Sequence, residues 1–310
     1  MRTKVSIIKC DTYDSVRLKE SIENSLELIG GIGRFVKRSD KVLIKPNLLS
    51  ARLPEEAVDT HPEFVRAVIR IVKEAGGIPS IGDSPGSFFT VKSVNQVFEQ
   101  SGMKGVADDE GVDLEIFNEA IHINGYPIAR AIKEFDVVIN LPKLKTHSLA
   151  ILTGAVKNMY GFVPGLSKVQ YHKAAPNINE FSKIIADIFK ITRPDLSIMD
   201  GVVGMDGDGP AAGRVRKIGY IVASSDAVSL DAVFSEMAGV PYSKNKVLMA
   251  VTERGLGKGK LEDIEVLGED LNVSRIDDFK LPKTALPYRA PSFIAKYIAR
   301  IIYFCPFINK

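Results

Sequence analysis

The sequence predicts an α/β fold: a mostly parallel, doubly wound sheet with helices on both faces and a small hairpin elaboration. Short apolar segments with strand character alternate along the chain with segments of helical hydrophobic periodicity, as in βαβ units. Polar residues follow several of these strands directly, which is where open parallel sheets bind ligands. A chain of 310 residues is long enough to bury a substantial core.

The first half of the chain shows a regular alternation. Strands are expected at residues 4–9, 41–45, 78–81 and 113–117, and helices at residues 14–29, 62–75 and 91–101. Pro62 suits the first turn of a helix, with Thr60 or His61 near the cap. Asn124-Gly125 is a strong turn signal and predicts a small hairpin over residues 121–128.

The second half continues the pattern. Strands are expected at residues 137–141, 196–199 and 218–223, and helices at residues 149–160, 177–191 and 226–238. Ser148 is the expected N-cap of the helix at residues 149–160, and Gly161 is its stop signal. Several prolines after residue 280 break the chain before a final amphipathic helix at residues 292–304. We therefore expect an α/β domain over residues 1–280, then a Pro-broken linker and C-terminal helix over residues 281–310.

Composition narrows the class of protein. Hydrophobic residues at 45% and charged residues at 25% are ordinary globular values, and a net charge of +3 with no Trp does not favour nucleic acid. Cys10 and Cys305 form no pair motif, which suits a reducing compartment. The sequence contains neither a signal-peptide pattern nor a transmembrane run. We expect a cytoplasmic protein with no nucleic-acid partner.

Residues 141–173 contain five Lys, two His and no Asp or Glu. Basic side chains after a strand end, together with the backbone N–H groups of a helix N-terminus, favour negative charge. We therefore expect a small anionic ligand here, bearing phosphate or carboxylate. The residues expected to bind this anion or an anionic cofactor are Lys45, Asn47, Lys143, Lys145, Ser148, Lys157 and Asn158. A solvated basic loop is the alternative, although apolar residues are interleaved with the lysines.

A Gly-rich acidic segment follows the strand at residues 196–199. It carries Asp200, Asp206 and Asp208, whose carboxylates are oxygen ligands of the kind that Mg²⁺ or Ca²⁺ prefers. A divalent metal is therefore expected at these three residues, across a crevice from the lysines. The alternative is that the aspartates cap turns or pair with the lysines.

Proton transfer has three candidates in the basic segment. His147 and His172 bracket it, and an unperturbed imidazole titrates near neutral pH. Lys145 is the third candidate catalytic residue, because a lysine desolvated beside other cations can lose its proton and act as a base or nucleophile. The sequence does not rank Lys143, Lys145 and Lys157 for that role. His61 and His122 are more simply explained as a helix-capping residue and a structural residue.

Six motifs occur in a fixed order along the chain. They are IKPNL (residues 44–48), THPE (60–63), GDSPG (82–86), NLPKLKTH (140–147), TGAVKNMYG (153–161) and MDGVVGMDGDGP (199–210). Their order and spacing resemble the domain-of-unknown-function 362 (DUF362) family. The resemblance implies a link to redox chemistry, because many members join this domain to ferredoxin-like 4Fe-4S clusters. Two distant cysteines cannot ligate such a cluster within this chain, so it would lie in a missing C-terminal domain or in a ferredoxin-like partner.

Three functions are compatible with these residues. The first is a redox-linked enzyme that binds an anionic substrate or cofactor at the carboxyl edge of the sheet. The second is a non-catalytic binding or electron-transfer module of an iron–sulfur protein. The third is metal-dependent phosphoryl or carboxyl chemistry without a redox step.

Overall fold

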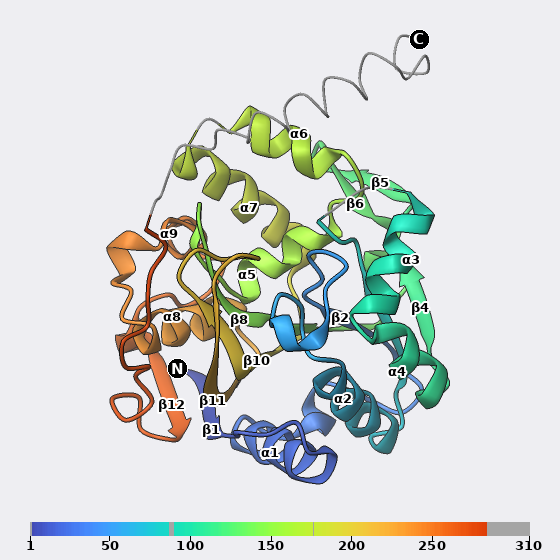
Figure 1. The fold of residues 1–310 in the computed structure, drawn as a ribbon, viewed down its shortest axis with the longest axis horizontal. Coiled ribbons are helices and arrows are strands. Elements are labelled where there is room, and N and C mark those ends of the chain that lie inside the picture. The colour runs from blue at the N-terminus through green and yellow to red at the C-terminus, as the bar shows by residue number, and fades with distance from the viewer. Residues whose placement is uncertain (1, 87–89, 176, 284–310) are drawn as a thin grey trace.

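The structure is a computed structural model that describes residues 2–86, 90–175 and 177–283. A ten-stranded mixed sheet runs through it in the order β12-β1-β11-β10-β7-β2-β3-β4, with β8 and β9 attached beside β10 (Figure 1). The strands of this sheet are β1 (Thr3–Lys9), β2 (Lys41–Pro46), β3 (Ile78–Asp83), β4 (Asp113–Ile116), β7 (Val137–Leu141), β8 (Lys143–His147), β9 (Ile151–Thr153), β10 (Leu196–Asp206), β11 (Arg214–Ser224) and β12 (Ile264–Gly268).

The centre of the sheet is parallel, as predicted. Strands β10, β7, β2, β3 and β4 run in the same direction, whereas β11 is antiparallel to both of its neighbours, β10 and β1. The predicted hairpin is also present, as the separate pair β5 (Ala120–Ile123) and β6 (Tyr126–Ala129). Its turn residues Asn124 and Gly125 both have positive φ, which explains the choice of Asn-Gly.

Helices cover both faces of the sheet. They are α1 (Ser15–Leu28), α2 (Pro62–Glu74), α3 (Val91–Gln100), α4 (Met103–Glu110), α5 (Ala155–Asn158), α6 (Ser167–Ala174), α7 (Ile178–Thr192), α8 (Ala227–Met237) and α9 (Lys246–Glu253). Helices α1 to α4 contribute to one hydrophobic core, and α5, α7, α8 and α9 contribute to the other (Figure 1). Successive residues of β2 divide between them, with Leu43 in the second core and Ile44 in the first.

The basic segment differs from the prediction. Residues 143–147 form strand β8 and not a loop, and the expected helix at 149–160 is reduced to the four-residue α5 and a 3₁₀ turn at Met159–Phe162. The prediction that Ser148 caps that helix is wrong: Ser148 lies exposed in the turn between β8 and β9, and Gly154 is the N-cap. Lys143 and Lys145 alternate with buried Leu144 and Thr146, which is strand periodicity.

The acidic segment also differs, because β10 continues to Asp206. Asp200 and Asp206 therefore belong to the strand, where the sequence had predicted an exit loop. Helix α4 was not predicted, and the predicted helix at residues 292–304 lies outside the described residues. Among the described residues, no helix combines the length and apolar character needed to cross a membrane.

Candidate functional site

Lys45 and Asp83 meet at the carboxyl ends of two neighbouring parallel strands, β2 and β3. Both side chains are buried, and Lys45 Nζ lies 2.9 Å from Asp83 Oδ1. The Asp83 carboxylate also accepts hydrogen bonds from the backbone N–H groups of Leu48 (3.0 Å) and Ser84 (2.8 Å). Burial lowers the pKa of Lys45, and the adjacent Asp83 favours its charged form. The charge of Lys45 is thus matched by a carboxylate of the protein itself.

Lys143 forms a second buried ion pair at the start of β8. Its Nζ lies 2.7 Å from Asp200 Oδ2, and both side chains are fully buried. The Tyr13 hydroxyl donates to Asp200 Oδ1 (2.8 Å) and accepts from Lys143 Nζ (3.0 Å). The backbone N–H of His61 donates to Asp200 Oδ2 (3.0 Å), and the His61 ring stacks on Tyr13 with centroids 3.6 Å apart. A predicted anion-binding residue and a predicted metal ligand therefore bind each other.

Three other lysines form no ion pair with a described carboxylate: Lys145 on β8, Lys157 on α5 and Lys168 on α6, which we call the lysine site. The ammonium groups of Lys145 and Lys168 donate to the backbone carbonyls of Val58 and Ser84. Burial lowers the pKa of Lys168 to about 7 and that of Lys157 to about 8, and it lowers the pKa of Lys145 as well. The charge of Lys157 lowers the pKa values of both other lysines further, which places the three in one electrostatic environment.

Two carboxylates favour the charged forms of these lysines without an ion pair: Asp59 acts on Lys145, and Asp83 acts on Lys145 and Lys168. Asp59 Oδ1 accepts from the backbone N–H of Leu49 (2.5 Å), and the buried Asp59 Oδ2 has no hydrogen-bond partner among the described residues. Burial raises the pKa of Asp59. The lysine site thus contains more cationic groups than carboxylates.

His147 and His172 both face the lysine site. His147 Nδ1 accepts from the backbone N–H groups of Leu149 (3.1 Å) and Ala150 (3.2 Å), so the neutral ring carries its proton on Nε2. The His172 ring stacks on Phe181 with centroids 4.2 Å apart. Burial, with repulsion from Lys157, holds the pKa of His147 well below its usual range and lowers that of His172 to about 4. Both imidazoles are therefore neutral at pH 7.

Asn47 and Asn158 belong to a chain of side-chain amides beneath the site. Asn47 Nδ2 donates to Asn158 Oδ1 (2.9 Å), Asn158 Nδ2 donates to Asn140 Oδ1 (2.8 Å), and Asn140 Nδ2 donates to Ser197 Oγ (3.1 Å). Asn47 Oδ1 is buried and has no partner within the described part of the chain. The chain ties the end of β2 to α5, which carries Lys157.

The N-terminus of α5 is already occupied by a carboxylate of the protein. Asp231, on α8, accepts from the backbone N–H groups of Ala155 (2.6 Å) and Val156 (3.0 Å). A Cβ at Gly154 would lie 2.2 Å from Asp231 Oδ1, so glycine is required for this approach. Neither this helix N-terminus nor Ser148, whose backbone N–H donates to the Gly209 carbonyl (2.9 Å), belongs to the lysine site.

The three predicted metal ligands are not brought together. Asp206 accepts from Arg214 Nη2 (2.8 Å) and Arg216 Nη1 (3.0 Å), and these hydrogen bonds lower its pKa against the effect of burial. Asp208 accepts from the backbone N–H of Lys283 (2.9 Å), and Asp200 binds Lys143. Over residues 2–86, 90–175 and 177–283, no group of three His, Cys, Asp or Glu side chains is placed to hold a metal ion.

Sequence reasoning missed several residues that shape the site. Lys168 lies within the acid-free basic segment, so composition alone was a usable signal for it. Asp59 lies in the long connection after β2, and Asp231 lies on a helix 76 residues away from its partner Ala155. Nothing local marks Tyr13 or Asp231, because their roles depend on contacts with distant segments.

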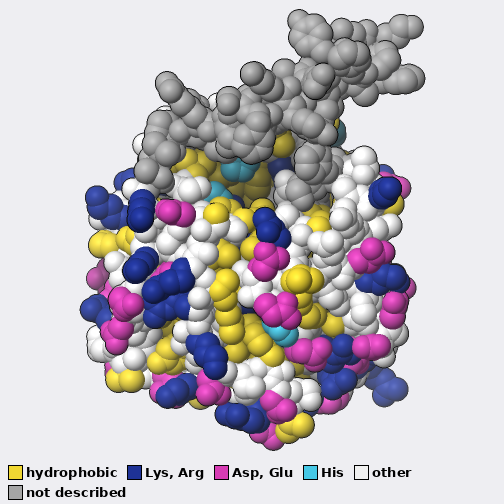
Figure 2. All heavy atoms as spheres, in the orientation of Figure 1, with side chains coloured by type: hydrophobic (Ala, Val, Ile, Leu, Met, Phe, Trp, Pro, Cys, Tyr) yellow, Lys and Arg dark blue, Asp and Glu magenta, His cyan; other side chains and the backbone are white. Residues whose placement is uncertain are grey.

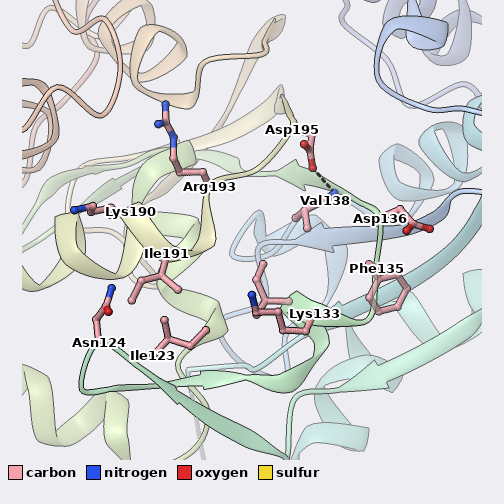
Figure 3. Close-up of a pocket in the computed structure, with 11 residues that line it drawn as sticks. Ile123, Asn124, Lys133, Phe135, Asp136, Val138, Lys190, Ile191, Arg193 and Asp195 are labelled. Atoms are coloured by element: carbon pink, nitrogen blue, oxygen red, sulfur yellow. Dashed lines mark hydrogen bonds between the residues drawn. The ribbon is translucent and has the colours of Figure 1, made fainter.

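Figure 2 shows histidine and Lys or Arg side chains between hydrophobic ones in the upper part of the face that it presents. A pocket of about 390 Å³ lies at the amino end of β7, lined by Ile123, Phe135, Lys133 and Lys190 among others (Figure 3). Its Asp195 carboxylate accepts from the backbone N–H of Val138 (2.8 Å). This pocket is at the opposite edge of the sheet from Lys45 and Asp83.

Comparisons with known proteins find a family model, a relative of similar sequence and a solved structure of similar fold. The family described as "Domain of unknown function (DUF362)" matches residues 42–236. Thylakoid-associated protein sll1697 of Synechocystis sp. is 34% identical over 294 residues, which cover 93% of this chain and 90% of that protein. The lactate racemase apoprotein from Thermoanaerobacterium thermosaccharolyticum has a similar structure, with a TM-score of 0.50 and 11% identity over 77% of this chain and 58% of the racemase. At that identity, the likeness shows a shared α/β fold alone.

Proposed function

This chain belongs to the DUF362 family, and from its lysine site we propose that it is an enzyme acting on a small anion that bears phosphate or carboxylate. The observation that supports the proposal is the group formed by Lys145, Lys157 and Lys168. These lysines gather near the carboxyl edge of the parallel strands without matching carboxylates. Open α/β sheets bind their ligands at this edge.

The five lysines differ in whether a buried carboxylate already pairs with the ammonium group. Lys45 and Lys143 each have a buried carboxylate within 3 Å, so an incoming anion would compete with an existing partner. The lysine site lacks such partners, and burial without a counter-ion disfavours the charged amines. A bound phosphate or carboxylate would supply the missing charge, and each charge-assisted hydrogen bond contributes about 1.5–3 kcal/mol.

A lysine suits proton transfer here better than the two histidines. With strongly lowered pKa values, His147 and His172 hold a proton only weakly at pH 7, and neutral His147 would donate a hydrogen bond through Nε2. Lys145 has a pKa lowered toward neutrality, which is the range for an efficient general base. We therefore propose Lys145 for proton transfer and His147 as a hydrogen-bond donor to the ligand.

The redox link and the ferredoxin-like partner stay predictions. They come from the resemblance to DUF362 proteins, and the one described cysteine, Cys10, is buried. A bound divalent metal also stays a prediction. We also propose a cytoplasmic location. The Synechocystis relative is named as thylakoid-associated, which supports a second proposal, that the protein associates with a membrane surface from the cytoplasmic side.

The test is isothermal titration with inorganic phosphate and with L-lactate as a simple hydroxycarboxylate. Lys157→Gln removes a charge that has no described partner, so it breaks no hydrogen bond or ion pair among the described residues. We expect this variant to bind phosphate about 10- to 100-fold more weakly than the wild type, which corresponds to about 1.5–3 kcal/mol. Lys157→Arg should keep most of the affinity.

Lys173→Gln is the matched control, because Lys173 is exposed on α6. Its affinity should equal that of the wild type. Equal weak binding by all four proteins would contradict an anion site at these lysines. Binding that depends on Lys173 as much as on Lys157 would indicate a diffuse basic surface.

A further inference from the structure

Lys157 differs in its contacts from the four buried lysines of the described residues. Lys45 and Lys143 are ion-paired, and Lys145 and Lys168 donate to backbone carbonyls. No hydrogen bond or ion pair joins Lys157 Nζ to any residue in the described part of the chain. The Lys157 side chain is also half-buried, whereas the other four are buried.

The surroundings of Lys157 disfavour its ammonium form. Strand β8 presents Lys145 and His147, and α6 presents Lys168 and His172, whose pKa values all respond to the charge of Lys157. From α8, the Asp231 carboxylate lies against the start of α5, and it accepts hydrogen bonds from the backbone N–H groups of Ala155 and Val156. Burial lowers the pKa of Lys157 to about 8, so an appreciable share of the amine is neutral near pH 7.5.

We propose that Lys157 is a nucleophilic amine that forms an imine with the aldehyde or ketone group of an anionic ligand. The inference rests on the proposed function, because Lys168 would hold the ligand's phosphate or carboxylate beside the amine, with Lys145 in its proposed role of proton transfer. The ligand class is thereby a small carbonyl compound with an acidic group. A desolvated lysine beside other cations is a known way to generate a nucleophilic amine.

The step needs no oxidant or reductant. The lone pair of neutral Nζ attacks the carbonyl carbon, the C=O π electrons move to oxygen, and a proton passes from nitrogen to that oxygen. A second proton reaches the carbinolamine oxygen, which leaves as water while the nitrogen lone pair forms the C=N bond of an iminium ion. Loss of the remaining N–H proton gives the imine and returns the proton that was used, so amine plus carbonyl becomes imine plus water.

The test uses the wild-type protein with glyoxylate as the probe and cyanoborohydride to reduce any imine to a stable secondary amine. Peptide mapping by mass spectrometry then measures the modification rate at each lysine in the same sample at pH 7.5. An ordinary lysine with a pKa near 10.4 is about 200-fold less neutral at this pH, and lower intrinsic nucleophilicity offsets part of the difference. We expect Lys157 to react at least about tenfold faster than exposed Lys173.

Two further measurements, a competition with phosphate and a charge-preserving variant, distinguish this inference from the anion proposal. Excess inorganic phosphate should slow the reaction at Lys157 and leave Lys173 unchanged. Lys157→Arg keeps the charge, so it should bind phosphate and lose the fast reaction, with its melting temperature confirming that it folds.

The outcomes discriminate between the two ideas. Phosphate binding in titration with no preference for Lys157 in the mapping overturns the imine inference and leaves the anion site standing. Fast reaction at Lys157 that excess phosphate does not slow, together with no phosphate binding in the titration, supports the reactive amine and contradicts the anion proposal. Uniform slow labelling together with no phosphate binding overturns both.

Discussion

Lys143 Nζ lies 2.7 Å from Asp200 Oδ2 with neither side chain exposed to solvent. The two residues come from strands β8 and β10, which pair in parallel with Lys143 opposite Asp200. Tyr13 completes the cluster with hydrogen bonds to both. A lysine and an aspartate that local sequence assigned to two different ligands are thereby a structural pair.

Replacing one partner of this pair should destabilise the protein. In Lys143→Met the Asp200 carboxylate stays buried without its cation, and such losses cost about 3–5 kcal/mol. Urea unfolding monitored by circular dichroism measures the change, with Lys173→Met on the surface as the control. The double variant Lys143→Met/Asp200→Leu should recover part of the loss. A small loss of stability with abolished phosphate binding would instead assign Lys143 to the ligand.

Gly161 should tolerate no side chain. A Cβ there would lie 2.4 Å from Asp83 Oδ1 and 2.5 Å from Lys45 Nζ, so Gly161→Ala must displace a buried ion pair. We expect a loss of about 1–3 kcal/mol in the free energy of unfolding. Gly105→Ala is the matched control, because nothing lies within 4 Å of the added methyl group on α4. That change should be neutral or stabilise the protein by up to about 1 kcal/mol. Equal effects of the two variants would contradict the close approach.

Stability should rise as the pH is raised from about 8 to about 10. The folded-state pKa of Lys168 is lowered to about 7 and that of Lys157 to about 8. Over this window the unfolded chain therefore binds more protons than the folded protein, because an unfolded lysine titrates near about 10.4. The slope is at most about 1.4 kcal/mol per pH unit for each lysine. Below about pH 7 the penalty is constant, since both states are protonated.

Urea midpoints measured at intervals from pH 7 to pH 10 test this sign. Lys168→Met should flatten the rise, whereas Lys173→Met should leave it unchanged. Burial also raises the pKa values of Tyr13 and Tyr160. These tyrosines make the free energy of unfolding fall with rising pH, but only above the pKa of an unfolded tyrosine, about 10. A free energy of unfolding that does not rise over this window would contradict the lowered pKa values of these lysines.

Anion binding should be accompanied by proton uptake. A bound anion favours the charged form of Lys157 and Lys168, so it raises pKa values that burial has lowered. Sulfate is a suitable probe, because its own charge does not change near pH 8. Calorimetric titration at pH 8 in two buffers of different ionisation enthalpy should give an uptake of up to about one proton per sulfate. Identical heats in both buffers would mean that the lysines are already charged before binding.

The alternation of apolar strands with periodic helices was enough to predict the fold. It placed β2, β3, β7 and the hairpin at Asn124-Gly125 within a few residues of their positions. These are short-range signals: an apolar run, a glycine stop and a turn dipeptide act on their own neighbours. The acid-free composition of residues 141–173 likewise marked the segment that carries the lysine site.

The roles of individual lysines were decided by the tertiary structure. Lys143 and Lys157 look alike in sequence, yet strand register sets Asp200 opposite Lys143, 57 residues away. Lys157 has no described carboxylate partner, and Asp231, which reaches the start of α5 from α8, accepts hydrogen bonds from backbone N–H groups there. Sequence determines how many charges a segment carries. Which of them remain unpaired, and so available to a ligand, depends on pairings between segments that meet only in the folded chain.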